Sequence, residues 1–241
     1  MNVLILGGAG MLGPYVAREL APNHNLRITD INPPQEDLPG EFLLLDVSDL
    51  DGVVAAATGM DAIVNLSVLR RDRQTAWDVS TRGCYNMMQA AVTHGIRRVI
   101  STGPHYTVAG RHITEIHDFD IVPDIPPQPG TNLYALTKAM GLEICRVFTQ
   151  HHDISVQHYL FYNFKDPAAI QPGERYAPYV ISWENSAEVF TLGLDIDLDA
   201  LPSRNEVFYV FADMPHGKFS NEKTKRILGF KPRKDVEVLW K

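Results

Sequence analysis

The sequence predicts an α/β fold built on a doubly wound parallel sheet. Short apolar runs alternate with longer helical patterns over the first 165 residues, and this alternation is typical of right-handed β-α-β units. A glycine-rich loop joins the first apolar run to the first helical pattern. The chain has 241 residues, of which 45% are hydrophobic, enough for one large core. Together these observations indicate a Rossmann-type sheet.

The expected elements follow one another in a regular order. Residues 3–6 form a short apolar run closed by glycines, which predicts a buried parallel strand. The helix expected over 11–20 has Pro14 in its first turn, where a missing N–H costs little. Gly95 is placed to cap a long helix expected at 74–94. Further strands are expected at 26–29, 42–45, 62–65, 98–101 and 155–160, and further helices at 49–58 and 133–150.

The C-terminal part of the chain has a different pattern. After about Phe164 the strict alternation fades, although helices near 184–194 and 220–228 and a strand at 207–211 are still expected. We therefore expect residues 1–165 to form the Rossmann domain and residues 166–241 to form a small lobe integral to it. Ligands of such sheets bind beyond the carboxyl ends of the strands. The lobe is thus placed to bind a substrate.

Composition and charge exclude several classes of protein. The net charge is −7 and the basic residues are scattered, so nucleic acid is not an expected partner. The two cysteines, Cys84 and Cys145, lack CxxC spacing, which favours a reducing compartment and a cytoplasmic location. No apolar run of membrane-spanning length occurs in the sequence, so no membrane association is expected. The histidines lack the spacing and carboxylates of a metal site, and none is expected.

The glycine loop predicts a dinucleotide site. Gly7, Gly10 and Gly13 directly follow a strand and open a helix, the context in which such a loop binds pyrophosphate. Asp30 ends the second strand, where a carboxylate can accept hydrogen bonds from the adenosine ribose. No Arg or Lys follows it at 31–34, so a 2′-phosphate would be repelled. The sequence therefore favours NAD over NADP, and residues 1–165 are expected to bind it.

Asp46 and Val47 close the third expected strand much as Asp30 closes the second. They could hold the adenine edge of the cofactor. An aspartate here is equally well explained as the cap of the following helix, and the sequence leaves both interpretations open.

Tyr134 and Lys138 indicate the chemistry. A tyrosine and a lysine four residues apart share one face of a helix, so the ammonium can lie close to the phenol. Tyrosine ordinarily ionises near pH 10, and a neighbouring positive charge favours the phenolate and lowers its pKa. Such a tyrosine can take or return a hydroxyl proton near neutral pH.

These motifs together resemble a known family. The spacing GxxGxxG is followed some 120 residues later by Tyr-x-x-x-Lys. Between them, residues 78–86 are similar to the N-V-x-G-T-x-N-L helix of the extended short-chain dehydrogenase/reductases, the NAD-dependent epimerase/dehydratase family. Residues 220–232 resemble the closing helix of that family, with its L-G-W/F-x-P ending. The resemblance covers nearly the whole chain.

The resemblance implies roles for several residues. Tyr134 would be the general base or acid, and Lys138 would bind the nicotinamide ribose and lower the pKa of Tyr134. A hydroxyl after the fifth strand usually contacts the reacting oxygen, but Gly103 stands at the customary serine position, so Thr102 is assigned this role. Ser101 is an alternative, and so is the absence of any such hydroxyl. Further cofactor contacts are implied for Met11 and Leu12 of the glycine loop and for Asn65, Leu66 and Ser67 after the fourth strand.

Within the family, the uronate dehydrogenases suggest a substrate. Their S-S-N-H segment is similar to Thr102-Gly-Pro-His105, and their R-M-x-x-x-W-L-S-x-D-D segment is similar to residues 175–185. By this resemblance Arg175 would bind a sugar carboxylate, and His105 and Ser67 would contact the sugar; a guanidinium suits a carboxylate. His105 as a loop cap and Arg175 as a surface residue remain alternatives.

The sequence thus predicts NAD-dependent oxidation of a hydroxyl on a sugar or sugar acid, as in a uronate dehydrogenase. One alternative is a nucleotide-sugar epimerase or dehydratase that retains its NAD. Another is a non-catalytic NAD-binding regulator. The resemblance also implies a homodimer, paired through the helices near 74–94 and 133–150.

Overall fold

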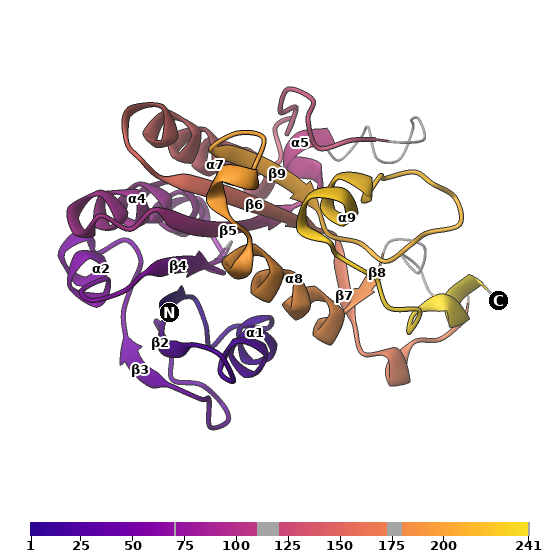
Figure 1. The fold of residues 1–241 in the computed structure, drawn as a ribbon, viewed down its shortest axis with the longest axis horizontal. Helices are drawn as coiled ribbons and strands as arrows, with labels where there is room; N and C mark the ends of the chain where they lie inside the picture. The colour runs from indigo at the N-terminus through magenta and orange to yellow at the C-terminus, as the bar shows by residue number, and fades with distance from the viewer. Residues whose placement is uncertain (70, 110–120, 173–179, 241) are drawn as a thin grey trace.

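The fold, obtained as a computed structural model, is organised around one parallel sheet of seven strands (Figure 1). The structure describes residues 1–69, 71–109, 121–172 and 180–240. The strand order is β3-β2-β1-β4-β5-β6-β9, and every neighbouring pair is parallel. The strands are β1 (Asn2–Leu6), β2 (Asn25–Asp30), β3 (Glu41–Leu44), β4 (Ala62–Asn65), β5 (Arg98–Pro104), β6 (Ser155–Phe161) and β9 (Asn205–Tyr209). The predicted Rossmann-type sheet is confirmed, and its order reverses between β1 and β4.

Helices cover both faces of this sheet (Figure 1). One face carries α1 (Gly13–Leu20) and α8 (Trp183–Asp195), which pack against each other. The other face carries α2 (Leu50–Ala56), α4 (Gly83–His94) and α7 (Leu133–His151). Further helical segments in the described parts of the chain include α3 (Arg73–Trp77), α5 (Tyr106–Ala109), α9 (Glu222–Leu228) and single turns at Pro167–Ala169, Leu198–Ala200 and Glu237–Trp240.

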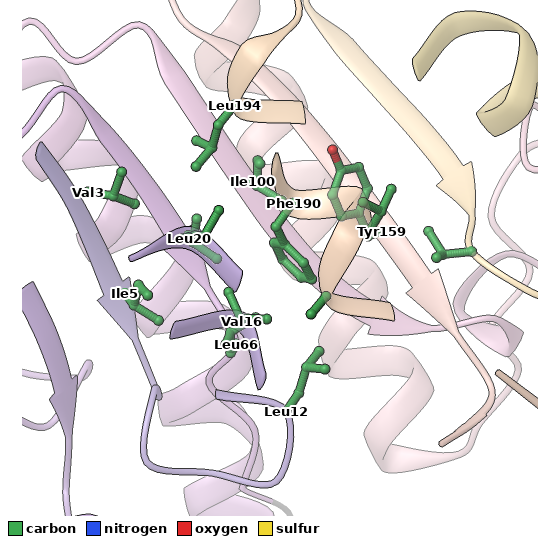
Figure 2. Packing of buried hydrophobic residues seen from close by; sticks show 14 of the residues in the cluster. Val3, Ile5, Leu12, Val16, Leu20, Leu66, Ile100, Tyr159, Phe190 and Leu194 are labelled. Atoms are coloured by element: carbon green, nitrogen blue, oxygen red, sulfur yellow. The ribbon is translucent and has the colours of Figure 1, made fainter. Parts of the chain in front are cut away.

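Two hydrophobic cores lie on the two faces of the sheet, and β1 contributes to both. Val3 and Ile5 point toward α1 and α8, where they pack with Val16 and Phe190 (Figure 2). Leu4, next to them in sequence, belongs to the opposite core with residues of α2 and α4. All three β1 side chains are fully buried. A strand buried on both faces is apolar throughout, which explains why β1 appears in the sequence as an unbroken hydrophobic run.

The helix predicted at 74–94 is interrupted. Its first turn is α3, its last three turns are α4, and residues Asp78–Arg82 between them form a π-helical turn. Helix α7 packs closely against this turn at Gly141. A Cβ atom on Gly141 would lie 2.5 Å from the Ser80 carbonyl oxygen, so only glycine fits there. Gly95 ends α4 in the left-handed conformation, with φ of 65°, as predicted. Hydrophobic periodicity carries no signal for a π turn, since the pattern of apolar residues continues through it.

Residues after Phe164 contribute to two sheets. Strand β9 is the edge strand of the central sheet, paired with β6. Strands β7 (Asn163–Lys165) and β8 (Val180–Ser182) form a separate two-stranded parallel sheet beside it (Figure 1). Strand β5 is three residues longer than predicted, because Gly103 and Pro104 continue to pair with β6. Within the described residues, no helix is both long and apolar enough to cross a membrane.

Candidate active site

A cavity of about 600 Å³ lies at the carboxyl ends of the central strands. It extends across the point where the strand order reverses, the usual ligand site of such sheets. Its lining comes from the glycine loop (Gly7, Ala9, Gly10, Met11, Leu12), from β2 and β3 and the loops after them (Asp30, Ile31, Asn32, Pro33, Gln35, Leu45, Asp46, Val47), from the loop after β4 and the π turn (Leu66, Ser67, Val68, Leu69, Val79), from β5, α5 and α7 (Thr102, Gly103, Pro104, Tyr106, Tyr134, Lys138), and from β6, the residues after it and α8 (Phe161, Tyr162, Asn163, Phe164, Trp183).

The glycine loop can adopt its shape only because Gly7 and Gly13 carry no side chain. Gly7 has φ of 74°, and a Cβ there would lie 2.6 Å from the Ser67 Cα atom. A Cβ on Gly13 would lie 2.0 Å from the carbonyl oxygen of Gly8, so Gly13 packs inside the loop and is not among the lining residues. Helix α1 begins here without a side-chain cap. The Gly13 amide donates to the Gly10 carbonyl oxygen at 3.2 Å and Pro14 has no N–H, so an anion in the cavity would meet the positive end of the helix through the lining residues Gly10, Met11 and Leu12.

The cofactor end of the cavity continues along β2 and β3. Asp30 lines it, and its Oδ2 accepts a hydrogen bond from the Ala9 amide at 3.1 Å. Asp46 and Val47 also line it, and the Val47 carbonyl is held by the Asn86 side-chain amide at 2.9 Å. Among the described lining residues here, no Lys or Arg stands beside Asp30. The arrangement fits the uncharged ribose diol of NAD and disfavours a 2′-phosphate.

Tyr134 and Lys138 stand at the other end, in the first two turns of α7. The Asn132 side chain caps this helix by accepting a hydrogen bond from the Ala135 amide. Lys138 is 3% exposed, and its Nζ donates to the carbonyl oxygens of Ser67 at 2.8 Å and Thr102 at 3.1 Å. These carbonyls belong to the ends of two neighbouring strands. The ammonium is therefore held in place on the helix face it shares with Tyr134.

The predicted hydroxyl, Thr102, is engaged within the protein. Its Oγ donates to the Asn65 carbonyl oxygen at 2.9 Å. Asn65 is 2% exposed and its side chain accepts from the Ser67 amide at 3.0 Å, so it supports the lining without being part of it. Because a threonine has one hydroxyl proton, Thr102 in this arrangement has none to donate to a ligand.

His105 is not among the lining residues. Its ring is 1% exposed and has edge-to-face contacts with Tyr106 at 5.1 Å, Tyr162 at 4.1 Å and Phe219 at 5.1 Å between ring centroids. Burial lowers the pKa of His105 to about 3, so the ring is neutral. The ring packs against Tyr106 and Tyr162, both of which line the cavity, and the sugar contact of His105 stays a prediction from the sequence.

Arg175, the predicted carboxylate ligand, lies outside the described residues. In the described parts of the chain, no three His, Cys, Asp or Glu side chains are grouped so that they could hold a metal ion.

Sequence reasoning missed the aromatic wall of the substrate end. Phe164 and Trp183 stack with ring centroids 4.6 Å apart, and Tyr15 also stacks on Trp183, at 5.3 Å. Tyr106, Phe161 and Tyr162 extend the wall, and Asn163 adds an amide. The position of β6 could have predicted this wall. Because β6 is parallel to β4 and β5, its carboxyl end lies beside theirs, and the residues that follow it belong to the site.

A Rossmann sheet whose cavity joins a glycine loop and an acidic β2 end to a Tyr/Lys pair defines a class, the short-chain dehydrogenase/reductases. The chain belongs to the NAD dependent epimerase/dehydratase family, whose model matches residues 3–164. The resemblance read from the motifs is thereby confirmed, as are an enzyme of this superfamily and NAD as its cofactor.

Several characterised proteins are similar to it. An NAD-dependent glucose-6-phosphate dehydrogenase from Haloferax volcanii is 25% identical over 249 residues, which cover 96% of this chain and 92% of that protein. A uronate dehydrogenase from Agrobacterium fabrum is 29% identical over 151 residues, covering 61% and 55%. The crystal structure of a glucuronic acid dehydrogenase from Chromohalobacter salexigens superposes with a TM-score of 0.82 at 20% identity, covering 98% of this chain and 86% of that one.

Proposed function

We propose that this protein is an NAD-dependent dehydrogenase that oxidises a ring hydroxyl of a sugar or sugar acid, in the manner of a uronate dehydrogenase. The observation that carries the proposal is the position of the Tyr134/Lys138 pair. It lies in the same cavity as the glycine loop and Asp30, so one ligand site has both proton-transfer groups and a dinucleotide cradle. The sugar and sugar-acid dehydrogenases among the similar proteins support the substrate class.

The chain's own residues perform the proton chemistry. NAD, when bound, supplies the acceptor for the hydride that leaves the substrate carbon. Tyr134 takes the proton of the substrate hydroxyl as general base. Lys138, fixed by the Ser67 and Thr102 carbonyls, places a positive charge near the phenol and stabilises its ionised form.

The aromatic wall gives the sugar a place to bind. The apolar faces of a pyranose pack on aromatic rings, while its hydroxyls need hydrogen-bond partners. Phe164 and Trp183 supply ring surface, and Ser67 and Asn163, which line the same cavity, supply polar groups. The carboxylate ligand assigned to Arg175 remains a prediction from the sequence.

A direct assay tests the proposal. The purified full-length chain is incubated with NAD or NADP and a panel of glucuronate, galacturonate, glucose, glucose 6-phosphate and UDP-glucose, and NADH absorbance is followed. Stoichiometric NADH with a free sugar or sugar acid, and little activity with NADP, is the expected result. Isomerised UDP-glucose without net NADH would instead identify an epimerase, and NAD binding without turnover would identify a regulator.

We also propose a homodimer formed through α3, α4 and α7. These neighbouring helices expose large apolar side chains: Trp77, Tyr85, Met140 and Val147, each 37–44% exposed. Light scattering coupled to gel filtration should give a mass twice the 27.0 kDa of one chain. The double variant Tyr85→Glu, Val147→Glu should give the mass of a single chain. A monomeric wild-type protein at micromolar concentration would contradict the dimer.

A cytoplasmic location is proposed on the state of the cysteines. Cys84 and Cys145 are both free and buried. The two thiols are also hydrogen-bonded to each other, and the hydrogen bond from Cys145 lowers the pKa of Cys84. Neighbouring thiols that remain reduced fit a reducing compartment. Cell fractionation with an antibody to the chain tests this directly.

A further inference from the structure

The reacting oxygen needs a second hydrogen-bond donor, and the cavity contains an unassigned one. As hydride leaves a carbon that bears a hydroxyl, the oxygen becomes a carbonyl through a state with substantial negative charge. Preorganised donors aimed at such an oxygen contribute strongly to rate. Thr102 donates its proton to the Asn65 carbonyl, and Gly103 has no side chain. Neither residue can therefore supply that donor in this arrangement.

We infer that the hydroxyl of Tyr106 is this second donor, so that two phenols, Tyr134 and Tyr106, contact the reacting oxygen. The inference rests on the proposed dehydrogenase function. Both rings line the same cavity. They pack edge to face, with ring centroids 5.9 Å apart and an interplanar angle of 76°. Tyr106 also lies two residues after Pro104, the last residue of β5, so it is presented at the carboxyl end of the strand that contains Thr102 and Gly103.

The surroundings of Tyr106 hold its ring in place. The His105 amide, next to it in the chain, donates to the Phe161 carbonyl oxygen at 2.7 Å and ties this turn to the end of β6. The His105 ring is neutral and fully buried, and it meets the Tyr106 ring at an angle of 89°. The Gln128 amide donates to Val108 at 2.8 Å, which fixes the far end of the short helix α5. A donor that is fixed before the substrate binds needs no reorganisation during the reaction.

The two phenols have different roles in the reaction. The O–H bond of the substrate breaks and its proton goes to Tyr134, while the C–H bond breaks and its electron pair leaves with the hydride to NAD. The C–O bond becomes a double bond. Tyr106 keeps its own proton throughout and donates a hydrogen bond to the oxygen. Removal of the Tyr106 hydroxyl should therefore lower kcat and leave cofactor binding unchanged.

Three Tyr→Phe variants test the inference in the full-length protein. Tyr106→Phe should lower kcat about 100-fold on the best sugar substrate, with KM within threefold and with unchanged NAD affinity and Tm. Tyr209→Phe is the matched control, because the Tyr209 hydroxyl is buried away from the cavity and has no hydrogen-bond partner among the described residues. It should leave kcat unchanged. Tyr162→Phe examines the other phenol that contacts His105.

The outcomes separate the two proposals. A wild-type enzyme that is active while Tyr106→Phe retains kcat within twofold overturns the inference and leaves the proposed function intact. A change in KM alone also overturns it, because the phenol would then bind the sugar without stabilising the reacting oxygen. So does a loss of kcat in Tyr162→Phe rather than in Tyr106→Phe. A wild-type protein that binds NAD and oxidises nothing in the panel overturns both proposals.

Discussion

The two ends of the cavity are lined by different kinds of groups. The cofactor end consists of the glycine-loop backbone and of aliphatic and acidic side chains, with Gly7 in a left-handed conformation and close to Ser67. The substrate end consists of aromatic rings, with Phe164 and Trp183 stacked and His105 enclosed beneath Tyr106 and Tyr162. A backbone cradle recognises groups common to all dinucleotides, whereas a wall of side chains can change with each substrate. The first end identifies a family and the second distinguishes its members.

The largest effect is expected at Tyr134, the general base of the proposed reaction. Tyr134→Phe removes the group that takes the substrate proton, so kcat should fall by about 10³-fold or more. NAD affinity and Tm should stay at wild-type values, since the ring and its packing are retained. Steady-state kinetics and NAD titration by fluorescence provide both readouts. Turnover within tenfold of wild type would show that the proton is taken by another group.

A glycine pair isolates the cofactor end. Gly7 and Gly59 have nearly the same φ, 74° and 75°, but a Cβ on Gly7 would meet Ser67 at 2.6 Å while a Cβ on Gly59 would meet nothing within 4 Å. Gly59→Ala should therefore cost about 1–2 kcal/mol of unfolding free energy from φ alone and leave the NAD dissociation constant unchanged. Gly7→Ala should cost more and also weaken NAD binding at least tenfold. Calorimetric titration with NAD checks the comparison, and equal effects of the two variants would contradict it.

A phenylalanine pair isolates the substrate end. Phe164→Ala removes a lining ring that stacks on Trp183 and should raise the sugar KM about tenfold, with NAD affinity unchanged. Phe42 is half-buried in β3 and does not line the cavity, so Phe42→Ala should cost stability but leave KM alone. A rise in the NAD dissociation constant in Phe164→Ala would show that the two ends are not separable in this way.

The buried ring of His105 should make the stability of the fold depend on pH. Burial lowers the pKa of His105 from 6.5 to about 3, so the unfolded chain binds more protons between these values. The free energy of unfolding should therefore fall as pH drops below 6.5, with His105 contributing up to about 1.4 kcal/mol per pH unit. His105→Phe should reduce this slope, because the variant has no imidazole to titrate at this position. Denaturant melts at several pH values measure it. His158, whose pKa burial lowers to about 4, keeps part of the slope in the variant.

What the sequence could predict follows from the same contrast between the ends. Gly7, Asp30 and the Tyr134/Lys138 spacing are local patterns, because each depends on residues close together in the chain. The hydroxyl proton of Thr102 is donated to the carbonyl oxygen of Asn65, which is 37 positions away in the chain. The burial of His105 likewise depends on aromatic rings from three separate segments. No local pattern reports such contacts. The fold was predictable because strand and helix periodicities are local, and the aromatic wall was not because it is assembled by tertiary packing.

The π turn at Asp78–Arg82 has a consequence for sequence change. A π turn is equivalent to one residue inserted into an α-helix, and each residue of a helix turns the chain by about 100°. The wider turn absorbs this extra residue locally, so α4 presents the same side to the sheet as it would after a helix one residue shorter. Loss of a single codon within this turn should therefore convert it to an α turn and leave Cys84 and Met87 in the core. The same loss inside α4, which has no extra residue, would rotate the residues after it by about 100° and move core side chains toward solvent.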